Sequence, residues 1–99
     1  MLMATVDRLA SVRGYSGTVS AGSTANITVT QGARAYLVAV IPQGSTATAN
    51  HALSIVMVYN ASFGQVYPIK SGANVTIGVS GYTISISPTV ASTYRIIEF

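Results

Sequence analysis

The chain has 99 residues, of which only seven carry a formal charge, and its net charge is +3. An ordinary soluble domain is about a quarter charged, whereas this chain is 7% charged and 49% hydrophobic, so much of its surface must be neutral or covered. The absence of cysteine excludes disulfides and Cys-based metal sites. A chain of this length makes one domain with a thin core.

The first 13 residues are set apart from the rest of the chain. Apolar residues recur there at helical spacing, at Leu2, Val6 and Leu9, which predicts a short helix or an extended arm. We therefore expect residues 1–13 to form a separate N-terminal arm or helix and residues 14–99 to form a single β-sandwich domain.

Neither a secretion signal nor a membrane span is expected. The N-terminus lacks the basic region and the long apolar region of a signal peptide, and Asp7 follows directly. The longest apolar run, 35–42, falls far short of the roughly 20 residues that a transmembrane helix needs. We therefore expect no membrane insertion.

Strand-like alternation begins after a turn-rich stretch that holds a short strand around 18–20. The segment 26–30 places Ile27 and Val29 on one face and polar residues on the other, which predicts a half-buried antiparallel strand. The segment 35–41 is apolar on both faces, and a Pro-Gln-Gly-Ser turn ends it. This strand is therefore predicted to be covered on both sides.

The middle of the chain continues the same pattern. Residues 46–51 are predicted to form a polar loop, and residues 53–59 a second strand that is apolar on both faces. Residues 65–70 are predicted to be a short irregular or edge strand, because Pro68 cannot donate to a strand ladder.

The last third holds the clearest hairpin. Two alternating runs, 75–80 and 82–87, are joined by a two-residue link at Ser80 and Gly81. A final strand over 94–99 follows. Seven or eight short strands, with turn signals about every 8 to 12 residues, predict an all-β fold, an antiparallel β-sandwich or jelly roll.

The two strands that are apolar on both faces predict self-association. A strand of a small sandwich normally has one apolar face and one solvated face, and an exposed apolar patch marks an interaction site. Since the simplest cover is a symmetric copy of the chain, we expect a homo-oligomer. The candidate residues for the core or the subunit interface are Tyr36, Val38, Val40, Val56 and Val58.

The chain offers few groups for chemistry, and we expect no catalytic site, no cofactor, no metal site and hence no enzyme. Asp7 and Glu98, the only acids, lie near opposite ends of the sequence and are better explained as surface ion-pair partners than as a catalytic pair. His51 is the only histidine and no nucleophile elbow accompanies it, so a solvated side chain is expected. One histidine is also too few for a zinc site.

Two other functional classes stay open. In a carbohydrate-binding or adhesion module of a secreted protein, Phe63 or Tyr67 would contact sugar. In a single-stranded nucleic-acid-binding barrel, Arg34 and Lys70 would contact the phosphates. The second class is disfavoured because the five cations are scattered along the chain rather than clustered.

Three parts of the chain carry a resemblance: residues 16–30, the pair 69–77 and 81–87, and the terminal 93–99. They resemble the small jelly-roll tip and decoration domains of tailed bacteriophages, which occur on tail fibres and capsid fibres. The resemblance implies a non-enzymatic virion structural protein that forms a homotrimer. Residues 1–13 would attach it to other virion proteins, and distal loops would face a host surface glycan or protein. The candidate contact residues in those loops are Thr46, Thr48, Asn50, Phe63 and Tyr67.

Overall fold

The structure, a computed structural model, describes residues 14–31, 33–59 and 64–99. The predicted arm over residues 1–13 and the candidate contact residue Phe63 lie outside the described residues. The elements in chain order are β1 (Gly14–Val19), β2 (Ala25–Thr28), β3 (Ala35–Pro42), α2 (Ala47–Asn50), β4 (Ser54–Tyr59), β5 (Val66–Lys70), β6 (Val75–Ser80), β7 (Thr83–Pro88) and β8 (Ser92–Glu98).

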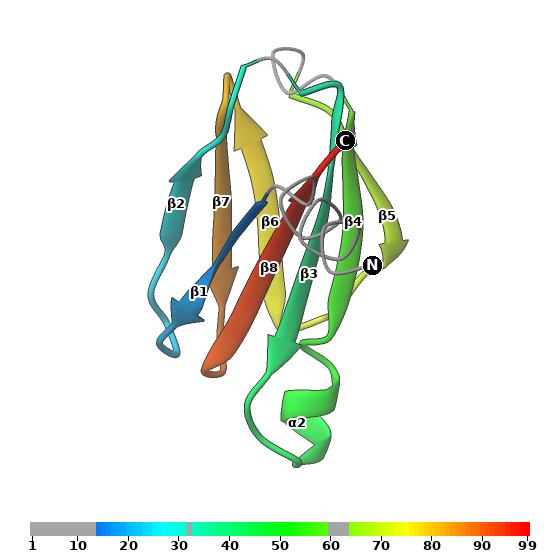
Figure 1. Cartoon of the computed structure of the whole chain (residues 1–99). Helices are drawn as coiled ribbons and strands as arrows, with labels where there is room; N and C mark the ends of the chain where they lie inside the picture. Colours follow the sequence, from blue (N-terminus) through cyan, green and yellow to red (C-terminus); the bar gives the residue numbers. More distant parts are fainter. Residues whose placement is uncertain (1–13, 32, 60–63) are drawn as a thin grey trace, which may run out of the picture.

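The strands form two antiparallel sheets that pack face to face, which confirms the predicted β-sandwich (Figure 1). One sheet has the order β1-β8-β3-β4-β5, and the other has the order β2-β7-β6. Because β3, β4 and β5 form a meander within one sheet, the strands are divided five to three. Within the described part of the chain, no helix is long and apolar enough to cross a membrane.

The predicted hairpin is present as β6 and β7, with its link one residue further along. Ser80 pairs with Thr83, so Gly81 and Tyr82 make the link. Gly81 has a φ of 59°, a left-handed conformation that glycine adopts without steric cost at the first position of a two-residue hairpin loop.

The core lies between the two sheets and consists of the inward-facing residues of both. Tyr36, Val38, Val40, Val58, Ile84, Ile86 and Ile96 are fully buried there. The hydroxyl of Tyr36 donates a hydrogen bond to the backbone carbonyl of Thr30, in the segment that crosses from the second sheet to the first. The hydroxyl of Tyr15 accepts from the Thr30 amide at 3.0 Å. Two tyrosines of one sheet therefore hold the crossing segment in place.

The prediction of a loop over 46–51 is wrong in part, because α2 forms a single helical turn there. The Thr46 side chain caps this turn by accepting from the Ala49 amide at 3.1 Å, as threonine does at helix N-termini. Ala49 and Ala52 are buried beneath the turn, although the surrounding side chains are polar and exposed. A four-residue helix leaves too little periodicity for the sequence to reveal it.

The segment before β6 docks closely onto the start of β4. The Gly72 amide donates to the buried Ser54 hydroxyl at 2.7 Å. A Cβ at position 72 would lie 2.6 to 2.8 Å from that hydroxyl and from the carbonyls of His51 and Leu53, so only glycine fits. Ser54 is thus an inward polar residue whose hydroxyl is satisfied by a neighbouring loop.

Candidate interaction surface

Strand β4 turns its bulkier apolar residues away from the core. Ser54, Val56 and Val58 are buried between the sheets. The alternate residues Ile55, Met57 and Tyr59, together with Leu53 before the strand, must therefore project from the opposite side. A strand in a solvated sheet is expected to do the reverse, because burying the larger apolar side chains stabilises the fold more.

The neighbouring strands continue this outward apolar surface. Leu37 pairs with Met57 on one side and with Ile97 on the other, and Met57 pairs with Tyr67. Directly paired residues share a face of a sheet, so one apolar row crosses four strands. We call the whole surface the apolar face; it consists of Leu37, Ala39, Ile41, Leu53, Ile55, Met57, Tyr59, Tyr67, Ile97 and Phe99.

Five large side chains of the apolar face each expose more than a third of their surface to solvent. The exposed fractions are 50% for Ile41, 38% for Leu53, 58% for Tyr59, 51% for Tyr67 and 57% for Phe99. These residues lie at both ends of β3, β4 and β5 and after β8, and the half-buried Leu37, Ile55 and Met57 join them across the sheet. A contiguous exposed apolar surface indicates an interaction site.

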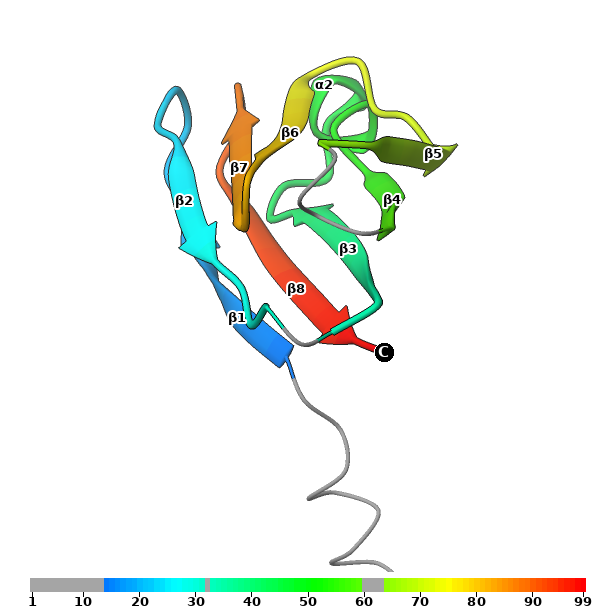
Figure 2. The same ribbon diagram turned by 90° about the horizontal axis from the view of Figure 1, so that it is seen from above.

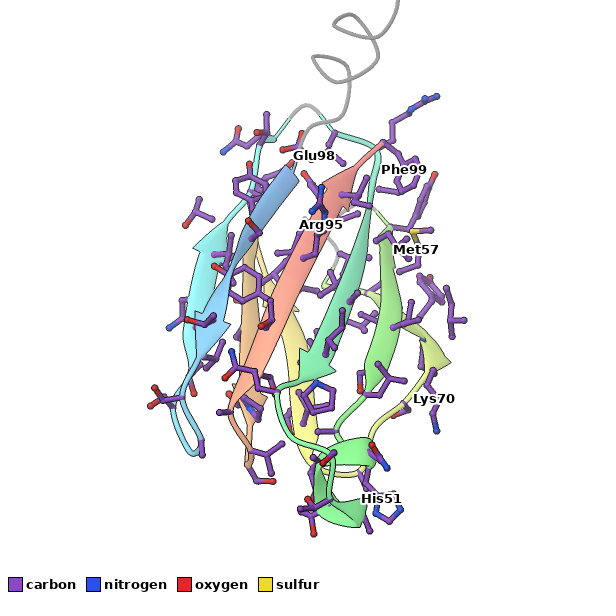
Figure 3. The ribbon with its side chains drawn as sticks, turned by 60° about the horizontal axis from the view of Figure 1, so that its bottom comes forward. His51, Met57, Lys70, Arg95, Glu98 and Phe99 are labelled. Atoms are coloured by element: carbon purple, nitrogen blue, oxygen red, sulfur yellow. The ribbon has the colours of Figure 1, made fainter. Side chains whose placement is uncertain are left out.

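Two cations border the apolar face. Arg95 pairs with Ala39 on β3, and Lys70 pairs with Ile55 on β4, so a second row runs from Arg95 across two apolar residues to Lys70. Figure 3 shows Met57 and Phe99 towards one end of the sheet and Lys70 towards the other. An apolar centre with a polar margin is the usual anatomy of a protein interface.

The outer face of the second sheet has a different composition. The outward residues of β2, β7 and β6 carry hydroxyl or amide groups, with Gly78 among them. We call this surface the hydroxyl face; it consists of Asn26, Thr28, Thr76, Ser80, Thr83, Ser85 and Ser87. Its residues bond across the strands, as between the Thr28 and Thr83 hydroxyls at 3.4 Å. This face is suited to contact with water.

The five residues predicted for the core or the interface all lie between the sheets. Tyr36, Val38, Val40 and Val58 are fully buried, and Val56 is 4% exposed. Within one chain they are thus core residues, and none of them is on the surface for a second copy to touch.

The four candidate contact residues that the structure describes do not form one surface. Thr46, Thr48 and Asn50 lie on or beside α2, between the end of β3 and the start of β4. Tyr67 pairs with Met57, near the opposite end of β4, and belongs to the apolar face. Figure 1 shows α2 and the start of β5 at opposite ends of the sandwich. The Thr46 side chain has a structural role, because it caps the helix. Thr48 contacts Asn74 only through its backbone carbonyl, which accepts from the Asn74 side chain at 3.2 Å.

The described ionisable groups do not converge. His51 is exposed at the end of α2, as predicted. No group of three or more His, Cys, Asp or Glu residues that could hold a metal occurs among the residues that the structure describes. Burial raises the pKa of the Tyr36 phenol above its usual value, and the nearby Glu98 carboxylate adds to this effect. This tyrosine is a hydrogen-bonded core residue.

The cations of the described ranges also lie apart. The Arg34 amide donates to the Phe99 carbonyl at one end of the first sheet, whereas Lys70 closes β5 at the other end. Arg95 lies in the middle of β8. A nucleic-acid groove needs cations along one track, and this arrangement does not supply one.

Sequence patterns did not determine which residues make up the outward apolar surface. They identified two strands with two apolar faces, and the candidates for the core or the subunit interface all came from the faces that turn inward. Leu37, Met57 and Ile97 form the central row of the outward surface and were not among the candidates. The signal that could have found them is cross-strand register, which alternation within one strand does not contain.

Comparison of the chain with protein-family models, with curated proteins and with solved structures gives no significant match.

Proposed function

We propose that the protein is a non-enzymatic structural protein of a virion, in which copies of the sandwich associate through the apolar face. A capsid or tail location, as a decoration or fibre-tip protein, follows from the phage resemblance. The occupant of the apolar face is a second copy of this chain. In this proposal the function of the protein is to build and decorate the surface of the virion.

One observation supports the proposal above all others: β4 faces outward with Ile55, Met57 and Tyr59, continuing Leu53 before the strand, and inward with the smaller Val56 and Val58. Leaving the larger apolar set in water would forfeit roughly 25 cal/mol for each Å² that a partner could cover. A strand with this orientation is stabilised when its outer side is also buried.

The size of the apolar face suits a protein partner. A large apolar or aromatic side chain has roughly 150–250 Å² of surface, so the five most exposed members together expose on the order of 500 Å². The half-buried Leu37, Ile55, Met57 and Ile97 add to this. One side of a standard protein interface buries about 800 Å². The apolar face approaches that area, whereas a small ligand would cover only a fraction of it.

The remaining parts of the proposal rest on the resemblance. Trimers are the expected assembly, because the tip and decoration domains that this chain resembles are commonly homotrimers. Residues 1–13 would contact other virion proteins, and the end of the sandwich that carries α2 would face outward, towards a host surface glycan or protein. The low content of charged residues agrees with a protein that is part of a permanent assembly.

A pair of charge-introducing variants tests the proposal. Met57→Lys places a cation in the central row of the apolar face, whereas Asn26→Lys places the same charge on an exposed position of the hydroxyl face. Burying an unpaired charge in an interface costs several kcal/mol. We therefore expect Met57→Lys to be monomeric by size-exclusion light scattering while Asn26→Lys keeps the wild-type mass. Equal masses for the two variants would refute the proposal.

The arrangement of two tyrosines favours an adhesion module as the second candidate. Tyr59 and Tyr67 are both more than half exposed and lie diagonally across β4 and β5, since Tyr67 pairs with Met57. Diagonal aromatic side chains can reach each other and could stack on a sugar ring. This candidate predicts a monomer whose glycan binding is lost in Tyr67→Ala, measured on a glycan array.

A further inference from the structure

The two edge strands of the five-stranded sheet are built differently. At the β5 edge, Pro68 removes a backbone donor and Lys70 adds a charge. The register with β4 also shifts between Ile55 and Val56, which marks a bulge. Proline, lysine and bulges are the devices that keep sheet edges from pairing with other chains. The β5 edge is therefore protected.

The β1 edge has none of these devices. Its sequence, Gly-Tyr-Ser-Gly-Thr-Val, contains no proline and no charge. It keeps an unbroken register with β8 over all six residues, from Gly14 opposite Ile97 to Val19 opposite Ser92. Ser16 and Thr18 are exposed. In Figure 2, β1 lies at the margin of its sheet, with β8 on its paired side.

The hydrogen-bonding direction of each β1 residue follows from the β8 ladder. The Phe99 amide donates to the Ala35 carbonyl of β3 at 2.9 Å. Alternate residues of a central strand bond to opposite neighbours, so Ile96, Tyr94 and Ser92 bond to β1. Their partners are Tyr15, Gly17 and Val19. The amides and carbonyls of Ser16 and Thr18 consequently point away from the sheet.

We infer that the edge of β1 that no other described strand occupies pairs antiparallel with β1 of a second copy, so that one sheet continues across both copies. The inference rests on the proposed self-association and adds a contact separate from the apolar face. A two-fold axis at Gly17 places Ser16 opposite Thr18 of the partner subunit, and each of these pairs exchanges two backbone hydrogen bonds.

The chemistry of β1 suits a copy of itself. A two-fold axis brings identical residues together, and like charges facing each other would repel, but β1 has none. Where the two strands come closest, Gly17 meets Gly17 of the partner subunit, and neither has a side chain to crowd the contact. Serine and threonine hydroxyls lie opposite each other beside it, which is a favourable cross-strand pair.

Hydrogen exchange of the Ser16 and Thr18 amides tests the inference directly. In the wild-type chain we expect both amides to become protected as concentration rises, with the Gly17 amide protected throughout by β8. Thr18→Pro removes one outward donor and leaves the bonds to β8, and proline is tolerated at a strand edge. In that variant the Ser16 amide should lose its concentration-dependent protection.

A second variant does not depend on how the strand tolerates proline. Ser16→Lys places like charges across the two-fold axis, and Ser80→Lys places the same charge at the edge of β6 as a control. We expect Ser16→Lys to weaken the contact by at least about tenfold, which corresponds to 1.4 kcal/mol, and Ser80→Lys to leave it unchanged.

The outcomes separate this inference from the proposed function. If Met57→Lys lowers the mass while the Ser16 and Thr18 amides exchange freely at every concentration, the apolar-face contact stands and the β1 contact is overturned. If the amides are protected and Ser16→Lys removes that protection, the β1 contact is established. A wild-type monomer at every concentration would overturn both.

Discussion

The two outer faces of the sandwich share a backbone geometry but differ in chemistry. The apolar face, on β3, β4, β5 and the end of β8, carries Leu37, Met57 and Tyr67 in one row. The hydroxyl face, on β2, β7 and β6, carries Thr28, Thr83 and Ser80 in one row. Both faces are poor in charge, so the difference between them lies in their exposed apolar area, which marks the apolar face as the proposed interface.

The hydroxyl face needs no partner, because its polar groups are satisfied by one another and by water. The Thr24 and Ser87 hydroxyls lie 2.8 Å apart, and the Ser85 hydroxyl donates to the Gly78 carbonyl at 3.5 Å. The apolar face has no such means of stabilisation in water. An uncharged surface can thus be either solvent-facing or an interface, and the hydroxyl groups decide which.

The largest change in the free energy of unfolding is expected from two neighbouring isoleucines that lie on opposite sides of β8, one in the core and one on the apolar face. Ile96 is fully buried in the core, so Ile96→Ala should lower the free energy of unfolding by about 2–5 kcal/mol. Ile97 faces outward and is half-buried, so Ile97→Ala should cost only about 1 kcal/mol in the dilute monomer. Chemical denaturation at low concentration measures both. Equal losses would contradict the assignment of inner and outer faces.

A smaller change in the free energy of unfolding is expected from replacing Tyr36. Tyr36→Phe keeps the ring in the core but leaves the Thr30 carbonyl without its donor, which should cost about 1 kcal/mol. Tyr59→Phe, on the exposed side of the sheet, is the control and should have no measurable effect on unfolding. A loss confined to Tyr59→Phe would show that the inner tyrosine is not the structural one.

The same tyrosine predicts a change in stability at alkaline pH. The pKa of Tyr36 is raised in the folded state, mainly by burial, so the folded chain holds the phenolic proton more tightly than the unfolded chain does. The contribution is fully present below the unfolded pKa of about 10 and is lost as the pH rises through the folded pKa. Tyr36→Phe should therefore flatten the decline of stability above about pH 10, measured by denaturant midpoints.

The smallest effect on folding is expected from making the hydroxyl face apolar. Thr28→Val combined with Thr83→Val removes one cross-strand hydroxyl contact and should change the free energy of unfolding by only about 0.5 kcal/mol. Association should nonetheless increase, because a second outer face now carries exposed apolar area. Light scattering measures the mass of the double variant in solution. An unchanged mass at high concentration would contradict the claim that apolar area determines which outer face associates.

Much of the fold could be predicted from residue patterns. Alternation located the strands that became β2, β3, β4, β6 and β7, and Pro68 marked β5 as an edge. These features are local, since each depends on residues within one strand or turn. The helical turn at Thr46 was missed because its cap and its buried alanines are too few to make a pattern.

The orientation of each strand could not be predicted, because it depends on contacts between distant residues. Strand β4 has apolar residues on both faces, and its inner side is fixed by Ser54, whose hydroxyl receives the amide of Gly72 eighteen positions away. The five-to-three division of the strands has the same origin. For this reason alternation could not decide whether Tyr36, Val38, Val40, Val56 and Val58 belong to the core or to an interface, and the structure places them in the core.

The mass of the wild-type chain in solution tests the central claim most directly. The claim is that the apolar face of one copy is covered by another copy. Size-exclusion light scattering at low concentration, where the β1 contact is open, should give a stable species close to three times the 10.2 kDa of one chain. A monodisperse monomer at every concentration would contradict the claim and would leave the adhesion module, with Tyr59 and Tyr67 as its contact residues, as the function to test.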